Sequence, residues 1–199
     1  IFEAARLGNV KVIKPAIFLA SMVFAGLLLN VTPNLAYKYT NGSNLEVAQR
    51  GVGEAEVYGF KFAQLVLPRI GHRNEKMAGI ANKYVTATPL VNENTTSSLG
   101  LVGTLGLMTV FGVIFLTLAG KIINKTLVTI SLLVLVFVMF GTIGGFGSIF
   151  SQLITTSIRG WNRISVFIGF GVLLVLFLTL QLEIEKRFYK KHAISALVL

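Results

Sequence analysis

The chain of 199 residues carries 18 Lys or Arg against 8 acidic residues, all of them Glu, and 54% of its residues are hydrophobic. It has no Cys, which excludes disulfides and thiolate chemistry within the chain. Four long runs carry no charged residue: 15–37, 94–120, 126–158 and 164–182. In a soluble domain of this size, most helices have a solvent-exposed face with charged residues. About 20 apolar residues cross a bilayer as a helix. We therefore expect an all-α integral membrane protein with four transmembrane helices. We expect its net charge of +10 to reflect contact with anionic lipid headgroups and not with nucleic acid.

The N-terminal region predicts a short cytoplasmic segment, 1–14, followed by the first span, 15–33. Pro15 suits the first turn of a helix, and the polar run Asn30–Asn34 marks the exit. The chain begins with Ile1 and shows no signal-peptide pattern. We expect an internal portion of a longer multi-pass protein, or a small subunit with trimmed ends.

Residues 34–98 predict an extracytoplasmic loop that contains two amphipathic helices. In 54–67, Val57, Phe60, Ala63 and Leu67 recur at helical spacing. In 74–84, Asn74 is a candidate N-cap ahead of a second apolar stripe. Both helices are expected to lie on the membrane surface.

The second half of the chain predicts the remaining spans. They are 99–119, 127–146 and 164–182, with a cytoplasmic turn at 120–126, an outer interfacial or re-entrant segment at 147–163 and a cytoplasmic tail at 183–199. The third charge-free run is too long for one crossing, and a glycine cluster at 141–147 marks the expected exit. Lys and Arg concentrate in the segments assigned to the inner side, which predicts N-in and C-in.

Two carboxylates and several cations of the outer segments are the candidates for chemistry. Glu54 and Glu56 are one residue apart, so they face different sides of a helix; either alone could act as a base. Cations at the membrane surface suit a lipid phosphate, and the candidates are Arg159, Arg163, Arg69, Arg73, Lys61 and His72. If 158–165 is helical, Arg159 and Arg163 share a face. The alternative is that these side chains anchor helix ends, reach lipid phosphates or pair with nearby Glu.

A family likeness is carried by the run from Arg50 through Glu54-Ala55-Glu56-Val57-Tyr58-Gly59-Phe60-Lys61 to His72-Arg73, by Asn92-Glu93 and Leu99-Gly100, and by Ile158–Ile168. It resembles bacterial polytopic membrane glycosyltransferases of the GT-C type. The resemblance implies sugar transfer from a polyprenyl-phosphate donor at the outer face of the inner membrane. It also implies a catalytic Asp or Glu in a first outer loop, which in this Asp-free chain falls outside the sequence or on Glu54 or Glu56. Donor-lipid binding would fall to Arg159, Arg163, Arg69 and Arg73.

Two other functions stay open. The chain could be a non-catalytic structural or accessory subunit that packs against other transmembrane helices in a larger complex. A transporter or flippase segment fits less well, because no predicted span holds an acidic residue or Lys. No cofactor or metal motif is evident, and a role for a divalent cation stays undecided. The expected partners are membrane lipids, a polyprenyl-phosphate sugar and other transmembrane helices.

Overall fold

The computed structural model describes residues 13–42, 50–121 and 123–197, with side chains up to Phe188. Every regular element in these ranges is a helix, apart from an isolated parallel bridge between Phe60 and Thr142. The chain divides into two compact units, 1–49 and 50–199. The predicted cytoplasmic segment 1–14 lies almost wholly outside the described residues.

Among the described residues, the first unit contains one helix, α2 (Ile13–Asn41), which is longer than the predicted span. It does not end at Asn30–Asn34, because Pro33 removes one backbone donor without stopping the helix. The helix ends instead at Gly42, whose φ of 79° is the left-handed conformation that glycine adopts readily. The Gly42 N–H donates to the Lys38 carbonyl at 2.9 Å and closes the last turn. No residue of α2 is buried within its unit.

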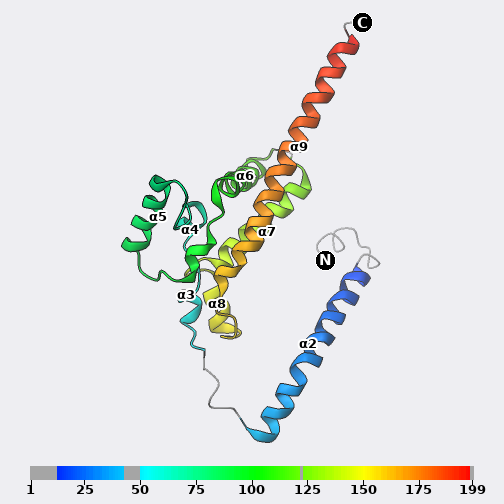
Figure 1. Cartoon of the computed structure of the whole chain (residues 1–199). Coiled ribbons are helices and arrows are strands. Elements are labelled where there is room, and N and C mark those ends of the chain that lie inside the picture. The colour runs from blue at the N-terminus through cyan, green and yellow to red at the C-terminus, as the bar shows by residue number, and fades with distance from the viewer. Residues whose placement is uncertain (1–12, 43–49, 122, 198–199) are drawn as a thin grey trace. The chain divides into compact units, whose positions relative to one another are not determined.

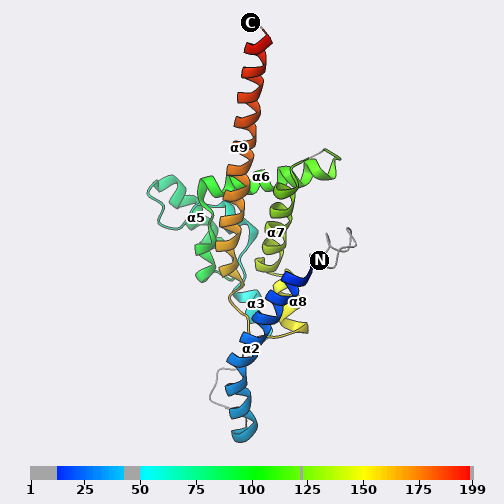
Figure 2. The same ribbon diagram turned by 90° about the vertical axis from the view of Figure 1, so that its right-hand side faces the viewer.

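The second unit packs three apolar helices with short helices around them (Figures 1 and 2). Its elements are α3 (Glu54–Val57), α4 (Phe62–Val66), α5 (Glu75–Ala87), η2 (Glu93–Ser97), α6 (Gly100–Leu118), α7 (Lys125–Gly141), α8 (Phe146–Leu153), η3 (Trp161–Ile164) and α9 (Ser165–Leu197). α7 lies alongside α9, whereas α6 runs across this pair: it is seen nearly end-on in Figure 1 and lengthwise in Figure 2.

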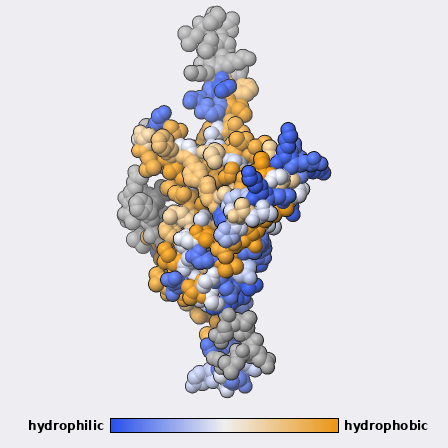
Figure 3. Space-filling model, turned by 90° about the vertical axis from the view of Figure 1, so that its left-hand side faces the viewer, coloured by the Kyte–Doolittle hydropathy of each residue, from blue (hydrophilic) through white to orange (hydrophobic). Residues whose placement is uncertain are grey.

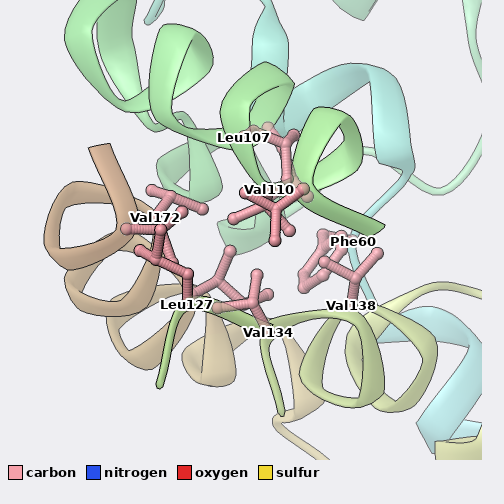
Figure 4. Close-up of a cluster of buried hydrophobic side chains, with 11 residues drawn as sticks. Phe60, Leu107, Val110, Leu127, Val134, Val138 and Val172 are labelled. Atoms are coloured by element: carbon pink, nitrogen blue, oxygen red, sulfur yellow. The ribbon is translucent and has the colours of Figure 1, made fainter. Parts of the chain in front are cut away.

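The core of this unit lies where α6, α7 and α9 meet (Figure 4). Its buried side chains include Leu107 and Val110 of α6, Val134 of α7 and Val172 of α9. Glycine allows the close approach of α6 to α9, since a Cβ at Gly106 would lie 2.5 Å from the Val172 carbonyl oxygen.

In the part of the chain that the structure describes, three helical stretches are long and apolar enough to cross a membrane: Ile13–Asn41, Gly100–Leu118 and Trp161–Phe188. α7, at the position of the predicted third span, is a shorter apolar helix of 17 residues. Apolar side chains occupy much of the visible surface in Figure 3, which is compatible with contact to membrane lipid. These features fit an integral membrane protein.

The single amphipathic helix predicted over 54–67 is wrong. The segment forms two short helices, α3 and α4, separated by a non-helical stretch at 58–61, in which the chain turns at Tyr58 and is extended at Lys61. There the Phe60 N–H donates to the Gly141 carbonyl (2.9 Å), and the Ile143 N–H donates to the Phe60 carbonyl (3.0 Å). The Phe60 side chain is fully buried against Gly141 in the helical core (Figure 4). The free energy gained by burying this aromatic ring exceeds the cost of interrupting the helix.

The predicted helix over 74–84 is present as α5. The Asn74 side chain accepts hydrogen bonds from the N–H groups of Lys76 and Met77, so it caps the helix as expected. α5 continues to Ala87, and Ala81 is its one buried residue.

The glycine cluster after α7 forms a tight turn that leads into α8. Gly144 has a φ of 72°, and a Cβ at Gly145 would lie 2.1 Å from the Met139 carbonyl oxygen. Only glycine fits this close approach. The chain therefore folds back on α7 at the position where the sequence predicts the exit of a span.

Candidate functional site

The two candidate carboxylates, Glu54 and Glu56, both contact the segment that follows α7. Glu54 Oε2 lies 3.6 Å from Arg159 Nη1, an ion pair slightly too long for a hydrogen bond. The Glu56 carboxylate accepts a hydrogen bond from the Gly144 N–H at 2.8 Å. Each carboxylate therefore links the start of the second unit to residues 142–163, and neither one is free of interactions within the fold.

Arg159 and Arg163 do not share a helical face, contrary to the expectation. Residue 159 is not helical, and the 3₁₀-helix η3 begins only at Trp161. The Arg159 guanidinium lies 4.9 Å from the centre of the Tyr58 ring, in addition to its pairing with Glu54. A Cβ at Gly160 would lie 3.3 Å from Arg163 Nε, so the Arg163 side chain passes close to its own turn. Arg159 therefore pairs with Glu54, whereas Arg163 is exposed and takes part in no ion pair among the described residues.

Lys61 is engaged within the fold as well. Its ammonium group donates a hydrogen bond to the Pro89 carbonyl and lies 5.8 Å from the centre of the Tyr84 ring. Burial lowers the pKa of Lys61 because the charged form loses hydration. These contacts join the start of α4 to the end of α5, so Lys61 has a structural role that the sequence did not reveal.

Arg69, His72 and Arg73 lie in the exposed connection between α4 and α5. His72 Nδ1 accepts a hydrogen bond from the Asn74 N–H at 3.1 Å, which places the imidazole in the cap of α5. Within the described part of the chain, the guanidinium groups of Arg69 and Arg73 take part in no ion pair. These two arginines, with Arg163, are the predicted cations that stay available to a ligand.

A buried pair of amides, which the sequence did not single out, joins the loop to the helices. Asn94 is fully buried; its Oδ1 accepts from Gln64 Nε2 (2.9 Å), and its Nδ2 donates to the carbonyls of Gly59 and Leu90 (3.0 Å each). All of these groups are satisfied, which makes the cluster a rigid support. In the sequence, Asn92-Glu93-Asn94 resembles an ordinary turn, and nothing local indicates this partnership.

A groove of about 220 Å³ opens between the start of α6 and the start of α9. Hydroxyl side chains line one part of it: Thr96, Ser97, Ser98 and Ser165. The rest is apolar or glycine: Leu99, Gly103, Val166, Gly169 and Leu173. The one signal in the sequence is the hydroxyl run 95–98 directly before an apolar helix. A polar mouth on an apolar wall suits a molecule with a polar head and an apolar tail.

Two of the available arginines lie near this groove along the chain. The Ser98 hydroxyl donates to the Leu67 carbonyl at 2.6 Å, and Arg69 follows Leu67 by two residues. Arg163 precedes the groove residue Ser165 by two residues. Arg69 and Arg163 are thus close to the groove in sequence, and neither is among the residues that line it.

In the parts of the chain with described positions, no three His or Glu side chains gather as a metal site would require. Comparison of the chain with family models, with curated proteins and with solved structures found no match.

Proposed function

We propose that this chain is a segment of a GT-C-like membrane glycosyltransferase that uses a polyprenyl-phosphate sugar donor at the outer membrane face. The observation that carries the proposal is the groove between α6 and α9, which combines hydroxyl groups with an apolar wall. Arg69 and Arg163 are exposed cations that lie two residues from segments that form or contact this groove. A polyprenyl-phosphate sugar has the same division into a polar head and a long apolar tail.

The charges near the groove match the chemistry of such a donor. Guanidinium groups bind phosphate oxygens with two parallel hydrogen bonds, which fixes the orientation of the head group. Arg69 and Arg163 are exposed and free of ion pairs in the described residues. Arg159 and Lys61 are assigned structural roles instead, which narrows the set of candidate phosphate ligands.

Within this proposal the segment binds the donor and does not supply the catalytic base. Glu54 pairs with Arg159, and Glu56 accepts from the Gly144 backbone, so each carboxylate is committed to holding the fold together. The base then belongs to a part of the protein beyond this segment. The proposal places the protein in a bacterial inner membrane, N-in and C-in, with residues 34–98 outside.

The test is sugar transfer by the natural full-length protein reconstituted in liposomes with a radiolabelled polyprenyl-phosphate sugar. Charge reversal of these two arginines, Arg69→Glu with Arg163→Glu, is expected to lower transfer at least about tenfold, since each charge-assisted hydrogen bond contributes ~1.5–3 kcal/mol. Lys83→Glu is the control, because Lys83 is an exposed cation of α5 away from the groove. Transfer at the wild-type rate in the double variant, with normal insertion, would sink the proposal.

One observation favours the alternative of a non-catalytic accessory subunit. Both acidic candidates are structurally engaged, and α2 exposes large apolar side chains such as Phe18 (66%) and Leu29 (76%) within its own unit. A helix that is apolar all round is covered by lipid or by other helices. Transfer that requires a separately expressed partner protein would support this alternative.

A further inference from the structure

The first turn of α6 has no side-chain cap. Leu99 occupies the N-cap position, and its side chain offers no acceptor. The Gly100 N–H reaches the Ser98 hydroxyl at 3.4 Å, but the next N–H groups have no intrahelical acceptor. This helix end carries a partial positive charge and favours an anion.

A second, independent feature of the groove is the hydroxyl of Ser97. Ser97 lines the groove, its side chain is only 2% exposed, and its Oγ has no hydrogen-bond partner among the described residues. A buried hydroxyl without a partner is costly, and native proteins satisfy nearly all such groups. The neighbouring Ser98 differs, because its hydroxyl already donates to Leu67 and accepts from Gly100.

We infer that this groove binds a phosphate group carried on an apolar tail. The phosphate oxygens accept hydrogen bonds from the Ser97 hydroxyl and from the first-turn N–H groups of α6. The tail lies along the apolar wall that includes Val166 and Leu173. Polyprenyl phosphates and anionic phospholipids share this chemistry and carry a net negative charge, whereas phosphatidylcholine has a phosphate whose charge is balanced by its own cation. The inference rests on the proposed function only where the lipid is a polyprenyl phosphate.

The experiment measures equilibrium binding of tritiated polyprenyl phosphate to the full chain in nanodiscs of zwitterionic phosphatidylcholine. Ser97→Ala removes a hydroxyl that has no partner among the described residues, so none of the hydrogen bonds described for the fold is lost. We expect it to weaken binding about three- to tenfold, the effect of one hydrogen bond. The matched control is Ser131→Ala in α7, which removes another fully buried, unpartnered hydroxyl outside the groove; it is expected to change nothing.

A second pair of variants tests the apolar wall. Val166 is 72% exposed and lines the groove, so Val166→Trp narrows it without disturbing the core. The adjacent Phe167 is 62% exposed and does not line the groove. Val166→Trp is expected to weaken binding and Phe167→Trp to leave it unchanged.

The probes separate the phosphate from the tail and one lipid from the other. A neutral polyprenol of the same length is expected to bind weakly and to be insensitive to Ser97→Ala. Competition by phosphatidylglycerol identifies a phospholipid headgroup as a ligand, and competition by inorganic phosphate identifies free phosphate as one. The inference would be overturned if Ser97→Ala and Ser131→Ala bound polyprenyl phosphate equally well. It would also be overturned if Ser97→Ala weakened the binding of polyprenol as much as that of polyprenyl phosphate.

The two proposals fail in different ways. If Ser97→Ala weakens lipid binding while sugar transfer by the full-length protein is unchanged, the groove binds a phosphate lipid that is not the donor. If transfer depends on Arg69 and Arg163 but Ser97→Ala binds lipid normally, the arginines serve the transfer reaction and the placement of the phosphate at Ser97 is wrong.

Discussion

Two segments of the second unit, 54–66 and 75–87, have similar amphipathic patterns but very different surroundings. The first breaks into α3 and α4 and buries Phe60, Gln64 and Leu65. The second is one continuous helix, α5, in which only Ala81 is buried. Met77 and Ile80 of α5 stay 43% and 49% exposed.

The difference shows that an apolar stripe does not reveal what covers it. In 54–66 the cover is the protein's own α6 and α7, which Phe62 and Phe60 contact. In the stripe of α5, Ala81 is buried and Tyr84 is half-buried, whereas Met77 and Ile80 stay exposed. The segment 54–66 is therefore part of the helical core, while α5 is an appendage joined to it through Lys61 and Tyr84.

The largest expected effect comes from truncating the ring that joins the segment 54–66 to the core. Phe60→Ala leaves a cavity beside Gly141 and is expected to cost about 3–5 kcal/mol of unfolding free energy. Met77→Ala in α5 removes a half-exposed side chain and should stay within about 0.5 kcal/mol of wild type. Thermal and denaturant unfolding in detergent micelles measures both, and similar losses for the two variants would contradict the difference between the segments.

The next largest difference in unfolding free energy is expected between two glycine-to-alanine substitutions, one against the segment 54–66 and one in α5. A Cβ at Gly141 would lie 2.2 Å from Phe60 Cε1 and 2.5 Å from Ile164 Cγ2, so Gly141→Ala is expected to cost about 1–3 kcal/mol through overpacking. A Cβ at Gly79 in α5 meets nothing within 4 Å, and Gly79→Ala should gain up to about 1 kcal/mol of helix propensity. The same unfolding assay should give opposite signs. A neutral Gly141→Ala would mean that Phe60 is not seated there.

A smaller effect is expected from the ion pair that fastens the segment 54–66 to residue 159. The side chains of Glu54 and Arg159 are 28% and 48% exposed, so solvent screens their attraction. A double-mutant cycle with Glu54→Gln and Arg159→Gln should give a favourable coupling below about 1 kcal/mol. An unfavourable coupling free energy, or a favourable one far above about 1 kcal/mol, would contradict a partly exposed ion pair between these two side chains.

The smallest expected effect is a pH dependence from Lys61. Burial lowers the pKa of Lys61 in the folded state below its usual 10.5, so the unfolded chain binds more protons between the lowered pKa and 10.5. Stability should therefore rise slightly with pH across that alkaline window. Lys61→Met should remove this contribution, and unfolding of both proteins as a function of pH measures it. An identical pH slope in the two proteins would show that Lys61 makes no such contribution.

The sequence predicted the helical class and the approximate positions of its apolar helices, because charge-free runs and caps such as Asn74 are local signals. It did not predict the break at 58–61, since the partner of Phe60 is Gly141, more than 80 residues away. The pairing of Glu54 with Arg159 and the burial of Asn94 depend on the same long-range contacts. The hydroxyl run 95–98 is a local signal, but the groove itself could not be predicted, because its lining comes from two stretches distant in sequence, 96–103 and 165–173.

Hydrogen exchange tests the central structural claim, that the segment 54–66 belongs to the helical core, most directly. The Phe60 and Ile143 N–H groups donate to backbone carbonyls across the isolated bridge, so their exchange requires opening of the core. In nanodiscs, mass-spectrometric exchange should be as slow for peptides covering 59–66 as for those covering the buried turns of α6 and α9, and much faster for α5. Equal exchange of 59–66 and α5 would contradict the account, because it would place both segments on the membrane surface alike.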